Sequence, residues 1–310
     1  MKRPRAIGRL ITEEDSALFS RRALAPPSMD DDAHQMPLAE RFEVREPMFS
    51  FDQIVLDEHV TREIDSVCAR IQHHDTLYTE WGLSSIDPNG ARVAINLYGP
   101  PGTGKTMCAE ALARRFGKPI LEVNYADVES KYVGETPKNI RAAFQAARNH
   151  NALLFFDEAD SILGRRMTTV QQSADHSVNV SRAVMLRQMD IFEGIVVFAT
   201  NLAKNYDAAF VRRIPFHIYM PLPDEACRIR LWKQLIPAQI PGRDHIDISI
   251  LTGASDGLSG GDIKNAIVLA STAAVQREGI QRRLTTEDLT EAIGAVIRAR
   301  QDVGSESYAH

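Results

Sequence analysis

The hydrophobic positions of this 310-residue chain follow two patterns, which alternate along its middle part. Short and almost continuous apolar runs are separated by longer segments in which apolar residues recur every three or four positions. Continuous apolar runs bounded by polar residues are typical of strands covered on both faces, as in a parallel sheet. Strands that alternate with helices predict an α/β fold with a doubly wound parallel sheet. The apolar runs lie at residues 93–98, 119–125, 152–156, 195–199 and 214–220.

A change of pattern near residue 221 indicates a second domain. After Pro221–Asp224, a plausible hinge, the strand pattern ends and helical periodicity takes over. The helical stretches lie at residues 225–236, 261–276 and 286–300. We therefore expect a large α/β domain at residues 47–221, an all-helical domain at 222–302 and a short tail at 303–310.

The region before the first strand carries a weaker pattern. Apolar residues at helical spacing, from Val60 to Ile71, predict a helix over residues 59–81. Residues 1–46 contain Pro26-Pro27 and three consecutive aspartates at 30–32, which would break any long helix. We expect this segment to be a flexible N-terminal arm, with a tether or recognition arm for a partner as the alternative.

Composition and charge narrow the class of protein. The net charge of −5 and a sequence pI near 6.0 give no basic surface of the kind that nucleic-acid binding requires. No apolar run reaches the roughly 18 residues of a membrane-spanning helix. Three scattered cysteines suggest neither a disulfide framework nor a metal site. We therefore expect a cytoplasmic protein that has no membrane span and does not bind nucleic acid.

The first candidate for chemistry is Gly99–Thr106, with the sequence GPPGTGKT, between an expected strand and an expected helix. In this context the pattern predicts a phosphate-binding loop. Gly102 and Gly104 allow backbone angles that aim successive N–H groups at one anion. Lys105 is expected to contact the β- and γ-phosphates of a nucleotide, and the Thr106 hydroxyl to ligate Mg²⁺.

Polar residues follow two of the expected strands, and arginines come next along the chain. Asp157 and Glu158 end one strand, where Asp157 could hold Mg²⁺ and Glu158 could polarise a water for attack on the γ-phosphate. Asn201 follows the next strand and could orient that water. Arg212 and Arg213 have the planar donors that suit a phosphoryl-transfer site. Surface acids, a turn asparagine and a solvated arginine pair are the alternatives for residues considered one at a time.

The order of these motifs resembles the AAA family of ATPases, nearest the single-ring branch of spastin, katanin and the outer-mitochondrial-membrane extractase, and a member of bacterial type. The resemblance covers about residues 49–300. The motifs that carry it are GPPGTGKT at 99–106, FDEAD at 156–160, ATN at 199–201, AAFVRR at 208–213 and LSGGDI at 258–263.

The resemblance implies ATP bound with Mg²⁺ between the α/β domain and a helical lid, in hexameric rings. It implies nucleotide contacts from Pro101, Thr103 and Met107 beside the loop residues named above, and from Gly261 in the lid. Adenine contacts are implied near Ile54–Leu56. Arg212 and Arg213 are implied to act in trans, on the ATP of the next subunit.

The segment Lys131, Tyr132 and Val133 is similar to the pore loop of AAA unfoldases. Six copies of Tyr132 in a ring would grip an extended peptide, whereas a tyrosine packed on its own domain is the alternative. The leading hypothesis is an ATPase that remodels protein substrates by threading them through a central pore. The alternatives are an ATP-switched assembly or disassembly chaperone without threading and, disfavoured by the charge, a nucleic-acid motor.

Overall fold

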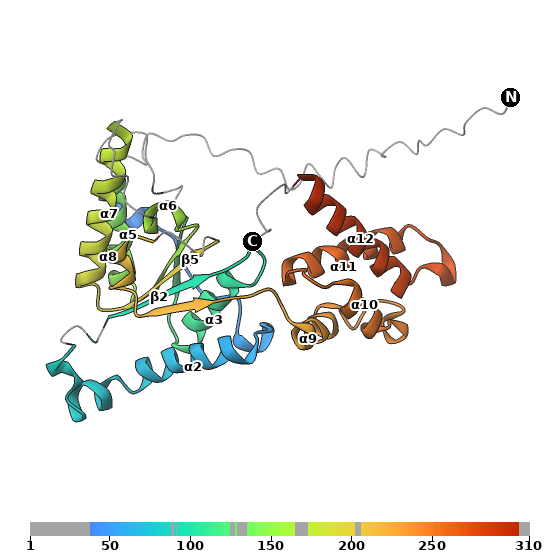
Figure 1. The fold of residues 1–310 in the computed structure, drawn as a ribbon, viewed down its shortest axis with the longest axis horizontal. Helices are drawn as coiled ribbons and strands as arrows, with labels where there is room; N and C mark the ends of the chain where they lie inside the picture. The colour runs from blue at the N-terminus through green and yellow to red at the C-terminus, as the bar shows by residue number, and fades with distance from the viewer. Residues whose placement is uncertain are drawn as a thin grey trace. The chain divides into compact units, whose positions relative to one another are not determined.

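The computed structural model describes residues 38–303 apart from residues 88–89, 91, 125–127, 129–134, 165–172 and 202–205. Residues 1–37 form a separate unit from residues 38–310, and only the second unit is described here. Its ordered elements are those shown in Figure 1. The helices are α2 (Glu58–Gln72), α3 (Lys105–Arg115), α5 (Glu135–Asn149), α6 (Asp160–Leu163), α7 (Ser173–Ile191), α8 (Ala208–Val211), α9 (Glu225–Leu235), α10 (Ile248–Ala254), α11 (Gly260–Val275) and α12 (Thr286–Val303).

The sheet has six strands in the order β1-β3-β4-β5-β2-β6. Only β1 is antiparallel to its neighbour; the pairs among the other strands are parallel. This confirms the expected α/β class and the parallel sheet. The strands are β1 (Val44–Arg45), β2 (Val93–Tyr98), β3 (Ile120–Asn124), β4 (Leu153–Asp157), β5 (Ile195–Thr200) and β6 (Phe216–Tyr219).

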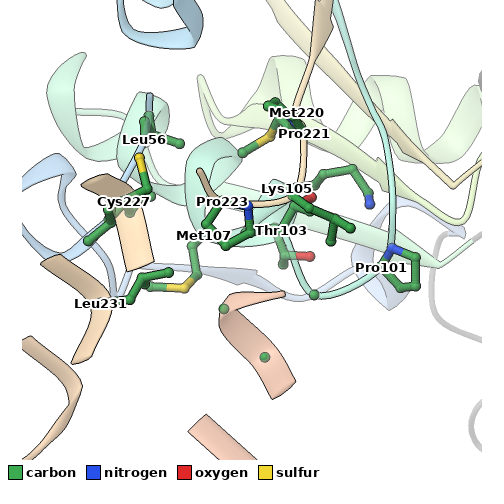
Figure 2. A pocket seen from close by; sticks show the side chains of 18 of the residues that line it. Leu56, Pro101, Thr103, Lys105, Met107, Met220, Pro221, Pro223, Cys227 and Leu231 are labelled. Atoms are coloured by element: carbon green, nitrogen blue, oxygen red, sulfur yellow. The ribbon is translucent and has the colours of Figure 1, made fainter. Parts of the chain in front are cut away.

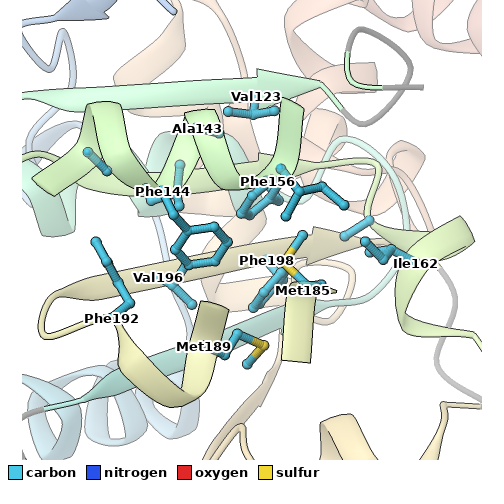
Figure 3. Packing of buried hydrophobic residues seen from close by; sticks show 14 of the residues in the cluster. Val123, Ala143, Phe144, Phe156, Ile162, Met185, Met189, Phe192, Val196 and Phe198 are labelled. Carbon is cyan, nitrogen blue, oxygen red and sulfur yellow. The ribbon is translucent and has the colours of Figure 1, made fainter. Parts of the chain in front are cut away.

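Two apolar clusters cover the two faces of the sheet, which explains why its strands are apolar throughout. On one face α2 and α3 pack through residues such as Val67 and Leu112. On the other face α5 and α7 contribute Phe144 and Met185, which lie beside Phe156 and Phe198 of the strands (Figure 3). A parallel sheet that is covered on both faces leaves its strand ends as the accessible place for ligands.

The C-terminal helices α9–α12 share a third apolar cluster, and this confirms the expected helical part. Its centre is Trp232, which is fully buried and donates from Nε1 to Ser255 Oγ at 3.0 Å. The seven-residue helix α10, capped by Asp247, was not expected. The separation of this cluster from the two sheet clusters agrees with a lid, although the domain limits given above remain predictions.

The start of the folded unit corrects the expected arm at residues 1–46. Residues Leu38–Arg41 form a 3₁₀ turn, and β1 pairs with β3. The physical reason is Glu110 of α3, whose buried carboxylate accepts from Arg45 at 2.9 Å and from the amide of Met48 at 2.6 Å. A buried charge needs such partners, so it holds the segment that supplies them.

The helix expected at residues 59–81 is divided. α2 ends at Gln72, and a π-type turn follows at Thr76–Glu80. The Tyr78 ring lies directly over Gly90 and its hydroxyl donates to Asp87 at 2.8 Å. These tertiary contacts hold the turn, and the apolar spacing along the helix could not reveal them.

Candidate functional site

The phosphate loop connects β2 to α3, at the carboxyl edge of the sheet. Gly102 and Gly104 have φ angles of 76° and 95°, which favour glycine. A Cβ atom at position 102 would lie 2.4 Å from the Ser259 hydroxyl oxygen, so the loop also needs glycine for close approach of the lid. The Thr103 hydroxyl donates to the Pro100 carbonyl at 2.9 Å and closes the turn.

Lys105 begins α3 and is buried. Its Nζ atom donates to the carbonyl oxygens of Gly99 and Pro100, each at 2.9 Å. Burial lowers the pKa of Lys105, while Asp157 and Asp160 act in the opposite direction. An ammonium held only by neutral carbonyls can exchange them for anionic oxygens and gain a charge-assisted bond.

Thr106 and Asp157 lie together, as a magnesium site requires. The Thr106 hydroxyl donates to Asp157 Oδ2 at 3.2 Å. One hydroxyl and one carboxylate suit Mg²⁺, which keeps several waters and takes other oxygens from phosphates. Among the described residues no group of three His, Cys, Asp or Glu side chains could hold a metal by itself.

Glu158 follows Asp157 with a φ angle of 50°, a left-handed conformation that is uncommon for a residue other than glycine. Its amide donates to Asp157 Oδ1 at 2.8 Å. The next amide, of Ala159, donates to the Ala199 carbonyl of β5 at 2.9 Å, which connects the ends of the two strands. Backbone strain of this kind is concentrated at functional sites.

All of these residues line one cavity of about 420 Å³. The predicted nucleotide-contact residues found there are Pro101, Gly102, Thr103, Gly104, Lys105, Thr106, Met107, Asp157, Glu158, Asn201 and Gly261. Ile54, Val55 and Leu56, where adenine contacts are implied, line the same cavity. A polar end at the phosphate loop and an apolar end suit a nucleotide, which has phosphates at one end and a base at the other.

The lid closes the apolar end of this cavity. Figure 2 shows Leu56, Cys227 and Leu231 on one side, with Met107 facing them and Lys105 and Thr103 further along the loop. Lid helices also bond the large domain directly. Gly261 donates to the Gly102 carbonyl at 3.0 Å, and Arg230 of α9 donates to the Leu56 carbonyl at 3.0 Å.

Lid residues are the part of the cavity that motif reasoning missed. Lys264, Cys227 and Leu231 line it, and none belongs to a recognisable motif. The one available signal for Lys264 was its place in the first turns of α11, three residues after Gly261. The cavity contact of Cys227 and Leu231 depends on how α9 packs, which local sequence does not specify.

Arg212 and Arg213 do not line the nucleotide cavity. Both line a second cavity of about 320 Å³, together with Arg92, Asp190 and Phe192. Arg213 donates to both carboxylate oxygens of Asp190, at 2.7 and 3.0 Å, and these bonds raise the pKa of Arg213. The arginines and their own phosphate loop are thus in different cavities. The segment Lys131, Tyr132 and Val133 lies outside the described residues.

A bilayer crossing needs a long apolar helix, and the described part of the chain contains none.

Comparison with known proteins agrees with this geometry. Residues 95–222 match the family model "ATPase family associated with various cellular activities (AAA)". The chain is 32% identical over 221 residues to 26S proteasome subunit RPT4 of Saccharomyces cerevisiae, covering 69% of this chain and 50% of the relative. It is 31% identical over 268 residues to the proteasome-activating nucleotidase of Methanopyrus kandleri, covering 84% and 59%. It is 34% identical over 232 residues to spastin of Naegleria gruberi, covering 68% and 44%.

A phosphate loop at the carboxyl edge of a parallel sheet, with an acid pair on the neighbouring strand end, defines a P-loop nucleotide-binding domain. The matched model specifies it further: the chain carries an AAA ATPase domain and belongs to that family through it. This confirms the expected family and the expected enzyme class, an ATPase. Proteasomal subunits and spastin both match, so the narrower assignment to one branch stays a prediction. The chain spans about half the length of the curated relatives it matches.

Proposed function

We propose that this protein hydrolyses ATP with Mg²⁺ in a hexameric ring and uses the energy to remodel protein substrates. The observation that carries the proposal is the division of the catalytic groups between two cavities. The phosphate loop, Asp157, Glu158 and Asn201 share one cavity, whereas Arg212 and Arg213 line another. An arginine that completes a phosphoryl-transfer site is commonly supplied by a neighbouring molecule.

In this proposal the loop amides and Lys105 bind the phosphates. Lys105 exchanges the Gly99 and Pro100 carbonyls for phosphate oxygens. Thr106 and Asp157 hold Mg²⁺, which neutralises phosphate charge when it is bound. Glu158 accepts a proton from the attacking water while Asn201 orients that water. Arginines of the neighbouring subunit stabilise the charge that develops in the transition state.

The substitution Glu158→Gln tests the hydrolytic role. It removes the proton acceptor but keeps the size of the side chain, so we expect kcat to fall by about 10²–10⁴-fold. Nucleotide affinity should stay within about twofold, since the loop amides and Lys105 are unchanged. ATP turnover by purified protein and binding of a fluorescent nucleotide measure the two quantities. Turnover equal to that of the wild type would contradict the assignment of Glu158.

Threading is the finer proposal, and its support is the sequence segment Lys131–Val133. Two of the relatives carry proteasome names, and a third is spastin. If the protein threads its substrate, Tyr132→Ala should keep basal ATP turnover and abolish substrate remodelling, and Tyr132→Phe should keep both. A photo-crosslinker at position 132 should label a substrate chain. Full remodelling by Tyr132→Ala would favour the alternative, an ATP-switched assembly or disassembly chaperone.

We also propose that the protein acts in a reducing, cytoplasmic environment. Its three cysteines, Cys68, Cys108 and Cys227, are free and buried, and burial raises the pKa of each thiol. Such thiols have little thiolate and react slowly. The negative net charge continues to argue against nucleic acid as a partner.

A further inference from the structure

One face of the sheet contains polar side chains where its neighbours are apolar. Asn96, at the middle of β2, is fully buried and lies in register with Phe198 of β5 and His217 of β6. Asn96 Nδ2 and His217 Nδ1 are 3.2 Å apart. A buried amide costs free energy unless it is hydrogen-bonded, so a polar pair here calls for an explanation other than packing.

The pair continues toward the nucleotide cavity. The Tyr206 ring stacks on His217 with a centroid distance of 6.3 Å, and its hydroxyl is hydrogen-bonded to Asn96 and Thr200. The Thr200 hydroxyl in turn donates to Asp160 Oδ1. Thr200 immediately precedes Asn201, and Asp160 lies two residues after Glu158. This end of the series therefore contacts both segments that position the attacking water in the proposed mechanism.

The other end contacts the arginine segment. Burial lowers the pKa of His217, while the carbonyls of Val211 and Ile214 oppose that effect and favour the charged ring. Those two carbonyls stand on either side of Arg212 and Arg213 in the chain. Phe210 and Ile214, which anchor the segment, are buried in the same apolar cluster as Phe198. A shift of the arginine segment would therefore be felt at His217.

We infer that Asn96, Thr200, Tyr206, His217 and Asp160 form a polar bridge that couples the arginine segment of each subunit to the water-orienting residues of its own nucleotide cavity. The inference rests on the proposed function. A subunit whose arginines engage the neighbour's nucleotide would adjust Asn201 and Glu158 through this bridge. These are positioning residues, since none of them lines the nucleotide cavity. The bridge gives the ring a route by which one cavity responds to the next.

The test replaces both ends of one bond with apolar side chains, in the double variant Asn96→Leu/His217→Leu. Replacing both partners with apolar groups can be nearly neutral for stability, so the variant should fold. Rings are assembled from mixtures with Glu158→Gln subunits, and ATP turnover is measured against their fraction. With half of the subunits inactive, coupled wild-type rings should keep about a quarter of their turnover, and uncoupled variant rings about half.

Three controls make the outcome specific. Thr252→Val removes a buried hydroxyl in the lid, where its partner is the Ile248 carbonyl, and should keep the wild-type curve. Tyr206→Phe removes only the hydroxyl of the bridge and should shift the curve toward proportionality if the double variant does not fold. Urea unfolding midpoints report whether each variant is intact.

Either of two results overturns the inference: a wild-type loss that is already proportional to the inactive fraction, or the same curvature in wild-type and bridge-variant rings. A failure of the proposed function is distinguishable, because wild-type protein alone would then show no ATP turnover, or a specific activity independent of protein concentration.

Discussion

The two cavities of this protein differ in how complete they are. The nucleotide cavity, of about 420 Å³, brings together residues from the phosphate loop, two strand ends, the segment before α2 and the lid. The arginine cavity, of about 320 Å³, contains cations but no phosphate loop. Its Arg213 is paired with Asp190 on the same chain. The first cavity can bind a nucleotide by itself, whereas the second has catalytic value only against another molecule.

The ion pairs beside the two cavities teach the same lesson. Glu110 and Arg45 flank α3, and the Glu110 side chain is only 2% exposed. Arg213 and Asp190 are 36% and 42% exposed. A buried pair is costly to break, whereas an exposed pair contributes at most about 1 kcal/mol and exchanges partners easily. The first pair thus has a structural role, and the second leaves Arg213 available to another partner.

The largest expected effect comes from Arg213→Ala. Loss of an arginine supplied between subunits should lower kcat by roughly 10³–10⁵-fold with nucleotide affinity unchanged. Arg92→Ala, which removes a cation from the same cavity, is the matched control and should stay within about tenfold of the wild type. Steady-state ATP turnover and nucleotide binding measure both variants.

Mixing gives a sharper form of this prediction. Arg213→Ala subunits retain Glu158, and Glu158→Gln subunits retain Arg213, so a mixed ring contains interfaces with both groups intact. Turnover of the mixture should exceed the sum of the two separate variants. A mixture no more active than that sum would mean that Arg213 serves its own cavity or none. The same experiment with Arg212→Ala tells which arginine acts.

The next effect concerns stability and acid pH. Burial alone would raise the pKa of Glu110, but Arg45 and the amides of Met48 and Phe49 outweigh it, so its pKa lies below the usual 4.5. Its contribution is therefore present above that usual value and is lost as the pH falls through the lower folded pKa. Glu110→Gln should reduce the free energy of unfolding by about 1–3 kcal/mol at pH 7 and by less at acid pH.

Urea unfolding at several pH values measures this difference between variant and wild type. Glu122→Gln removes the more exposed carboxylate that Arg45 also contacts, and Asp190→Asn breaks the exposed pair at the other cavity. Each should cost less than about 1 kcal/mol. A cost for Asp190→Asn equal to that for Glu110→Gln would remove the contrast between the two pairs.

The smallest expected effect belongs to Lys264, an exposed lid cation that lines the nucleotide cavity. Lys264→Met should raise KM for ATP by about two- to fivefold with kcat unchanged, because an exposed charge contributes under about 1 kcal/mol. The effect should shrink at high salt. Lys233→Met, on α9 but not lining the cavity, should leave KM unchanged. A changed kcat with unchanged KM would place Lys264 outside nucleotide binding.

Much of the fold could be predicted because its signals are local. A continuous apolar run such as 93–98 suits only a covered strand, and β2 has those limits. The arm boundary was wrong because residues 38–46 have no pattern of their own; their order comes from Glu110, distant in sequence. The lid residues Lys264 and Leu231 were missed for the same reason, since their contact with the cavity depends on the packing of α11 and α9.

The sequence by itself determined the sheet, the phosphate loop and the chemical identity of the groups at the strand ends, because spacing and residue type act within one element and its neighbours. Only the tertiary structure decided which groups share a cavity. It placed Asn201 with Lys105 and kept Arg213 apart with Asp190, and it joined Asn96 to His217 across two strands 121 residues apart. Such meetings depend on packing between distant segments, which no local pattern records.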